Sequence, residues 1–197
     1  QQGLQLHKIL PTSDDTQSLC AADYDQDGDL DLYVCVYRRD RKISGEMTAV
    51  LPSGEDNFVY HDANTGGPGS LFRNDGGGNF TDATDLVGLN QNNHRYSYAA
   101  VWEDFDNDGD VDLYVANDFG RDNLYQNNNG KFSDIAETAN VEDSASGMAV
   151  TCGDYDHDGW MDIFVSNMWS SAGNRVTHQP QFKAKAPAEI KKRIQRL

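Results

Sequence analysis

Short apolar segments, separated by turns rich in Asp, Asn and Gly, recur along most of the chain. Leu30, Leu32 and Val34 occupy alternate positions, as on a strand that buries one face. The clearest unit has four such segments, at residues 97–102, 111–116, 123–126 and 131–135. The pattern predicts an all-β fold of short strands.

The strands belong to a repeat of about 50 residues. Residues 70–82, SLFRNDGGGNFTD, resemble residues 123–134, NLYQNNNGKFSD. Four strands per period of roughly 40–50 residues are typical of a β-propeller blade. The first unit has a loop insertion at about residues 37–69, between its second and third strands. It carries four basic residues that are either solvated or contact an anion or a partner: Arg38, Arg39, Arg41 and Lys42.

Three nine-residue stretches, at residues 23–31, 104–112 and 154–162, hold 14 of the 32 acidic residues. All three read D-x-D-x-D-G-x-x-D. Three Asp side chains at alternate positions converge on one point if the chain curls around it, and the Gly at position six permits the turn through a positive φ. With the carbonyl of residue seven and the last Asp, they form an oxygen cage that suits Ca²⁺. Residue seven differs between loops, as expected where only its backbone is used: Asp29, Asp110 and Trp160.

Two other interpretations compete with a calcium loop on a β-hairpin. An EF-hand needs Glu at position 12, but Val34, Val115 and Val165 stand there, within runs that favour strands. Metal-free Asp/Gly turns held by side-chain hydrogen bonds would give a similar pattern. Three copies in one register, and repulsion of about 1–4 kcal/mol per carboxylate pair, favour a bound dication. His157 lies at a non-ligating loop position.

Composition narrows the classes of function. The 197 residues carry a net charge of −16, so a nucleic-acid backbone would be repelled. Mean hydropathy is −0.71 but aromatic residues reach 10%, which indicates a folded, loop-rich protein rather than a disordered one. No apolar run is long enough to span a membrane.

The three loops and the segment NLYQNNNGKF resemble the FG-GAP/VCBS repeat family, including integrin α-subunit propellers and, more closely, cartilage-acidic-protein-like secreted proteins. The resemblance covers about residues 4–175 and implies a Ca²⁺-stabilised extracellular propeller used for adhesion or recognition. Carried over to this sequence, it implies three calcium sites, in which residue seven of each loop contributes its carbonyl. The ligands would be Asp23, Asp25, Asp27, Asp29 and Asp31; Asp104, Asp106, Asp108, Asp110 and Asp112; and Asp154, Asp156, Asp158, Trp160 and Asp162.

We expect repeats over residues 1–170 and a basic tail at residues 171–197, with a helix after Pro187. Two full units, a half unit and a strand at residues 4–10 make about three blades, fewer than a closed propeller needs. The chain is therefore part of a longer one, an open arc, or completed by other subunits. Cys20 and Cys35 could face each other in a disulfide across the first hairpin.

The leading hypothesis is a non-enzymatic, secreted or periplasmic calcium-binding module. Its partner would be a protein, a glycan or copies of itself in a structural assembly. The alternative is a propeller-fold polysaccharide lyase or hydrolase, or a fragment of one. We expect no catalytic residues, because neither a nucleophile elbow nor a metalloprotease motif is present in the sequence.

Overall fold

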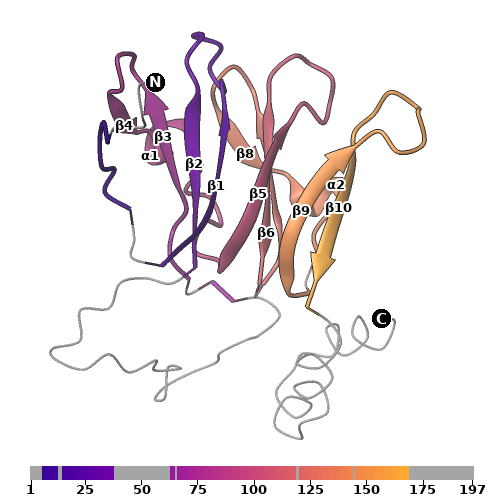
Figure 1. The fold of residues 1–197 in the computed structure, drawn as a ribbon. Helices are drawn as coiled ribbons and strands as arrows, with labels where there is room; N and C mark the ends of the chain where they lie inside the picture. Colours follow the sequence, from indigo (N-terminus) through magenta and orange to yellow (C-terminus); the bar gives the residue numbers. More distant parts are fainter. Residues whose placement is uncertain are drawn as a thin grey trace, which may run out of the picture.

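The computed structural model describes residues 6–12, 15–37, 63–64, 66–118, 120–143 and 145–168. In this part of the chain, three antiparallel sheets stand side by side (Figure 1). The first has the strand order β1-β2-β3-β4, the second β5-β6-β7-β8, and the third is the β9–β10 hairpin. The strands are β1 (Thr16–Ala22), β2 (Asp31–Val36), β3 (Ser70–Asn74), β4 (Phe80–Asp82), β5 (Ser97–Glu103), β6 (Asp112–Asn117), β7 (Asn123–Asn127), β8 (Phe132–Asp134), β9 (Gly147–Gly153) and β10 (Asp162–Asn167), with two short helices, α1 (Thr84–Val87) and α2 (Ala136–Ala139).

The propeller-type fold predicted from the repeat is confirmed, with two four-stranded units and a half unit. The four strands expected in the second unit are β5 to β8, and each of their ends lies within one residue of the prediction. The spacing of the apolar segments and the Asp/Gly turns between them was thus enough to locate a whole blade.

The sheets pack through their first strands, because β1 lies beside β5 and β5 beside β9. Ser97 of β5 makes two hydrogen bonds to Val36 of β2: its Oγ accepts from the backbone N–H at 2.9 Å and donates to the carbonyl at 3.0 Å. Ser18 Oγ of β1 donates to the carbonyl of Tyr98 at 2.8 Å. These polar links fix the first two blades against each other.

Strand β2 is covered on both faces. Tyr33 and Cys35 belong to the main core, together with residues of the second sheet, whereas Val34 and Val36 pack in a separate cluster on the other face. The prediction that Leu30, Leu32 and Val34 share one buried face is wrong for Leu30. Leu30 is 61% exposed, because it precedes β2 and lies at the hairpin tip.

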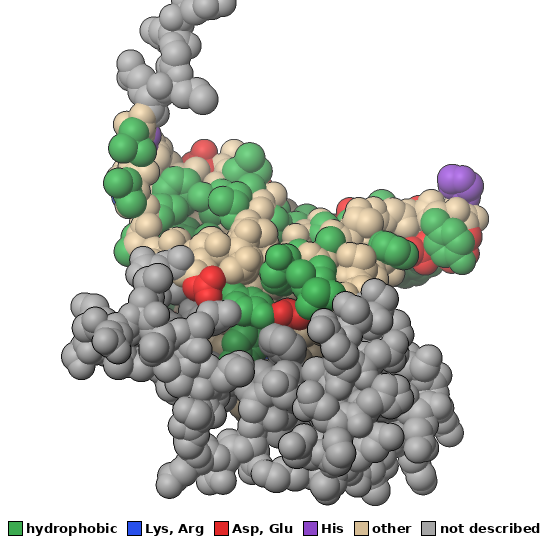
Figure 2. All heavy atoms as spheres, turned by 60° about the horizontal axis from the view of Figure 1, so that its bottom comes forward, with side chains coloured by type: hydrophobic (Ala, Val, Ile, Leu, Met, Phe, Trp, Pro, Cys, Tyr) green, Lys and Arg blue, Asp and Glu red, His purple; other side chains and the backbone are tan. Residues whose placement is uncertain are grey.

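The third hairpin has no further sheet against it in the described residues. Its Phe164 is 67% exposed, whereas Tyr33 and Tyr114 at the same repeat position are each 1% exposed. Tyr155, residue two of the third acidic stretch, is likewise 80% exposed, while its counterpart Tyr24 in the first stretch is 2% exposed. Figure 2 shows this hairpin projecting at the right, with hydrophobic side chains on its surface.

Two smaller predictions are also wrong. Residues 6–10 form no strand, although one was expected at residues 4–10. Cys20 lies opposite Tyr33 in the β1–β2 register and Cys35 opposite Ser18, so the two cysteines are offset, and both are free thiols.

Two predicted segments lie outside the described residues: most of the insertion, at residues 38–62, and the tail helix after residue 187. In the described part of the chain, no helix is both long and apolar enough to cross a membrane.

Candidate metal centre

Each acidic stretch forms the tip of a hairpin. Residues 23–31 join β1 to β2, residues 104–112 join β5 to β6, and residues 154–162 join β9 to β10. We call them loop 1, loop 2 and loop 3. All three tips lie at the same end of the sheets, at the top of Figure 1.

The first Asp of each loop holds the turn closed. In loop 1, the carboxylate of Asp23 accepts hydrogen bonds from the backbone N–H groups of Asp27 and Gly28, both at 3.0 Å. The equivalent bonds to Asp104 and Asp154 measure 3.0–3.1 Å. In every loop, the N–H of residue seven also donates to the carboxylate of residue five at 2.9 Å. The backbone of residue seven is therefore held in the same way whether its side chain is Asp or Trp.

Two positions in each loop have left-handed backbone conformations. The glycines at position six have φ between 90° and 96°, as the sequence predicted. Position four was not predicted to be left-handed, although φ there is 57–63°. The residues at position four are Gln26, Asn107 and His157, and of these Asn and His tolerate this region better than most side chains.

The turns bring carboxylates together as the spacing predicted. One oxygen from each of three residues lies within 4.8 Å of the others in every loop. At this distance, unscreened carboxylates repel one another. The groups are Asp23, Asp25 and Asp27; Asp104, Asp106 and Asp108; and Asp154, Asp156 and Asp162.

Loop 1 provides a direct test of whether a cation fits. Asp25 Oδ1 is buried and has no hydrogen-bond partner. Burial, together with the carboxylates of Asp27 and Asp23, raises the pKa of Asp25 above its ordinary value. A buried anionic oxygen with two like charges beside it is unfavourable unless a positive ion balances it. The donor set is hard oxygen, so the residues fit a hard divalent cation.

The ninth Asp has a structural role that the sequence did not reveal. Asp31 is fully buried, and its two oxygens accept the backbone N–H groups of Tyr24 at 3.2 Å and Asn74 at 2.8 Å. Asp112 likewise accepts from Phe105 at 3.1 Å and Asn127 at 2.7 Å. Burial raises the pKa of both carboxyls to about 6. Each of them therefore ties its own loop to the third strand of its sheet.

In loop 3, Asp162 accepts the corresponding bond from Tyr155 N–H at 3.1 Å. The described part of the third sheet has no third strand to supply the second bond. Loop 3 also differs in its group of clustered carboxylates, which contains Asp162 where the other two loops have their residue five; Asp158 is not part of it.

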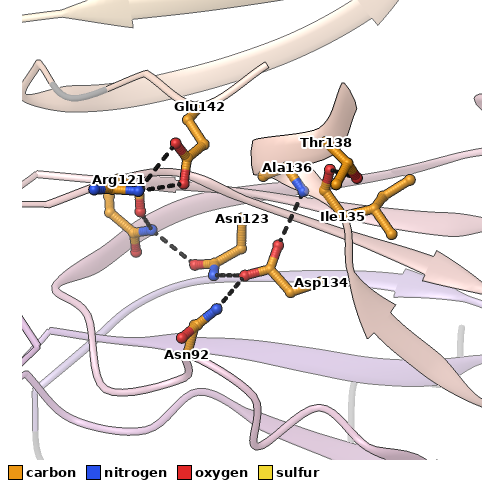
Figure 3. A network of polar contacts seen from close by, with 9 residues as sticks. Asn92, Arg121, Asn123, Asp134, Ile135, Ala136, Thr138 and Glu142 are labelled. Atoms are coloured by element: carbon orange, nitrogen blue, oxygen red, sulfur yellow. Dashed lines mark hydrogen bonds and ion pairs between the residues drawn. The ribbon is translucent and has the colours of Figure 1, made fainter. Parts of the chain in front are cut away.

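Two acidic residues outside the loops, Asp134 and Asp82, stabilise the fold. Figure 3 shows Asp134 at the end of β8, whose Oδ2 accepts from the side-chain amides of Asn92 and Asn123, both at 2.8 Å. Its Oδ1 accepts from Ala136 N–H at 3.2 Å and so holds the start of α2. Asp82 has the same position in the first blade and accepts from Thr84 N–H at 3.0 Å. The final Asp of each repeated segment is thus a local structural anchor.

Comparisons with known proteins agree with this architecture. The family model described as "FG-GAP-like repeat" matches residues 54–115 and 104–165. Cartilage acidic protein 1 of Homo sapiens is 34% identical over 119 residues, which cover 57% of this chain and 18% of that protein. The Mus musculus protein of the same name is 32% identical over 119 residues with the same coverage, and that of Xenopus tropicalis 32% over 109 residues, which cover 53% of this chain and 16% of that protein. The matches thus cover less than a fifth of each of these relatives. Because the family model covers more than half of the chain, this protein belongs to the FG-GAP-like repeat family.

Proposed function

We propose that the three hairpin tips bind Ca²⁺ and that the chain acts as a non-enzymatic extracellular recognition or adhesion module. The observation that carries this proposal is a single network, repeated three times, that gathers carboxylates within 4.8 Å and leaves Asp25 Oδ1 buried without a partner in loop 1. Residues one, three, five, seven and nine of each loop would hold the ion, residue seven through its carbonyl. The ion would neutralise the carboxylates and make the hairpin tip rigid.

Calcium is favoured over magnesium because the loops offer many oxygens on a curled backbone. Ca²⁺ accepts six to eight oxygen ligands in flexible geometry, whereas Mg²⁺ demands an octahedron and usually keeps several waters. Extracellular calcium modules commonly bind at roughly 10⁻⁴–10⁻³ M, so such sites fill outside the cell and stay empty in the cytosol. The similarity to cartilage acidic protein 1 and the net charge of −16 are consistent with a secreted protein that recognises another protein or a glycan.

Thermal unfolding in millimolar calcium and in EDTA tests the proposal. At free calcium about tenfold above the dissociation constant, each site adds about 1.4 kcal/mol. Three sites should therefore raise the melting temperature by roughly 10 °C in a chain of this size. An identical melting temperature in both buffers contradicts calcium binding.

The variant Asp25→Asn adds a sharper signature. It should lose part of the calcium-dependent gain, yet in EDTA it should be at least as stable as the wild type, because one repelled carboxylate is gone. The control Asp85→Asn, on an exposed position of α1, should keep the full gain.

Self-assembly is a second candidate, supported by the exposed side chains of the third hairpin. Tyr155 and Phe164 occupy positions that another sheet covers in the first blade. A second copy that packs there would bury them. The mass of the native protein in solution, measured with and without calcium, tests this: a monomer in both conditions excludes it.

A further inference from the structure

Asn127 joins two of the acidic loops from the inside. It lies on β7, is fully buried, and its amide makes three hydrogen bonds. Nδ2 donates to the carbonyl of Tyr24 in loop 1 at 2.9 Å and to that of Val111 in loop 2 at 3.1 Å, and Oδ1 accepts from Gly130 N–H at 2.8 Å. The side chain therefore holds the backbones of both loops at fixed positions.

The connection extends through the buried carboxylates. The backbone N–H of Asn127 donates to Asp112, which in turn accepts from the N–H of Phe105 in loop 2. On the other side, Tyr24 donates its N–H to Asp31. A continuous series of hydrogen bonds thus runs from the last residue of loop 1 to the second residue of loop 2.

A second bridge crosses between the loops at the surface. Gln26 Nε2 donates to the carbonyl of Gly109 and to Asp110 Oδ1, both at 2.9 Å. The other oxygen of Asp110 accepts from Asn129 N–H at 2.8 Å. Residue four of loop 1 is therefore attached to residues six and seven of loop 2, next to the carbonyl expected to face the ion.

The junction between loops 2 and 3 has the same design but is weaker. Asn107, also residue four, donates to the carbonyl of Gly159 at 3.3 Å. The described part of the third sheet has no third strand, so no counterpart of Asn127 joins these two loops.

We propose that Asn127 and Gln26 couple loops 1 and 2, so that a cation in either loop raises the affinity of the other. The inference rests on the proposed calcium binding. An ion orders the loop that holds it, and the two bridges transmit that order to the neighbouring loop, which then loses less freedom when its own ion binds. The effect is reciprocal, because coupling between two sites is the same in both directions. Loops 2 and 3, with one longer bond, are coupled less.

Calcium titration of the full chain by calorimetry measures this coupling. In the Asp156→Asn background, loops 1 and 2 remain. Adding Asp106→Asn to this background leaves only loop 1 intact, and adding Asp25→Asn instead leaves only loop 2 intact. The ratio of the joint binding constant to the product of the two single constants is the coupling factor. We expect about fivefold or more for loops 1 and 2, and a smaller factor for loops 2 and 3 in the Asp25→Asn background.

Two variants assign the coupling to its residues. Gln26→Ala, at the surface, and Asn127→Ala, in the interior, should each move the factor toward one. Because Gln26 is exposed, its variant remains informative if Asn127→Ala fails to fold. The matched control Gln17→Ala removes an exposed Gln whose side chain, within the described residues, donates to the nearby Asp15, and it should keep the factor. A purely structural role would weaken both single constants and leave their coupling unchanged.

The outcomes separate the two proposals. If calcium does not bind to the wild type, the proposed function fails, and the coupling with it. If calcium binds but the factor for loops 1 and 2 is one, calcium binding stands and the coupling is refuted. A factor that persists in both variants overturns the assignment to Gln26 and Asn127.

Discussion

Replacing Asp122 by Asn should change how the stability of the second blade depends on pH. Asp122 is 2% exposed, and its Oδ1 accepts from Asn117 N–H at 2.7 Å. Its Oδ2 lies 3.0 Å from the hydroxyl of Tyr114, which also lies 3.0 Å from the carbonyl of Val141. One hydroxyl proton cannot serve both acceptors. A protonated Asp122 resolves this, because it donates to Tyr114, which then donates to Val141.

The direction and magnitude of this pH effect on stability follow from the pKa of Asp122. Burial, with a contribution from Asp143, raises the pKa of Asp122 from 3.8 to about 8. Between about pH 4 and pH 8, the unfolded chain has lost this proton and the folded one keeps it, so rising pH favours unfolding. Each pKa unit corresponds to about 1.4 kcal/mol, so half of this displacement already amounts to about 3 kcal/mol. The stability from this group is complete below pH 4 and lost by about pH 8.

The variant Asp122→Asn is neutral at every pH and keeps the same bonds, since its amide accepts from Asn117 and donates to Tyr114. Urea unfolding at constant calcium should give similar stabilities for both proteins near pH 4, where the Asp122 carboxyl is protonated in the folded chain and still partly protonated in the unfolded chain. Near pH 8.5, the variant should be more stable by about 2–3 kcal/mol. The pH dependence of the difference isolates Asp122 and its coupling to Asp143, because groups that do not interact with Asp122 cancel. A difference that stays constant from about pH 5 to pH 9 refutes the reasoning.

Three further variants or measurements test the packing. Gly88→Ala should lower the unfolding free energy by about 1–3 kcal/mol, because its φ is +93° and the new Cβ would lie 2.7 Å from a β8 carbonyl oxygen. The control Gly77→Ala, whose Cβ would meet nothing nearer than 3.8 Å, should lower it less. Equal losses for the two variants in urea unfolding would contradict this. Leu113→Ala, at a fully buried position, should cost about 2–5 kcal/mol, against about 0.5 kcal/mol for Leu86→Ala, which is 64% exposed. Burial raises the pKa of Cys35 to about 11, so a thiol reagent at neutral pH should modify it at least about 100-fold more slowly in the folded protein than in urea; rapid labelling of the native protein would contradict its burial.

Much of the fold could be predicted from sequence because its information is local. The turn at Gly109 needs a positive φ, and the strands on either side of it have the composition of strands. The convergence of three carboxylates on each hairpin tip also follows from spacing alone, because alternate positions of a curled chain point the same way.

What the sequence could not give depends on contacts between blades. Tyr155 and Tyr24 occupy the same repeat position, but only Tyr24 has a neighbouring sheet, so their exposures differ greatly. The role of Gln26 depends on a loop that lies 83 residues away along the chain. Whether Cys20 and Cys35 face each other depends on the register of β1 against β2, which composition does not determine. In the observed register, Cys20 pairs with Tyr33, two residues away from Cys35.

The chain leaves β2 and returns to β3 at the end of the sheets opposite the three acidic tips (Figure 1). The two strand ends at which this connection attaches therefore lie away from the carboxylates and their hydrogen bonds. A change in length at this junction therefore acts at one end of the sheets, and the hydrogen bonds that shape the acidic hairpin tips at the other end need not change with it.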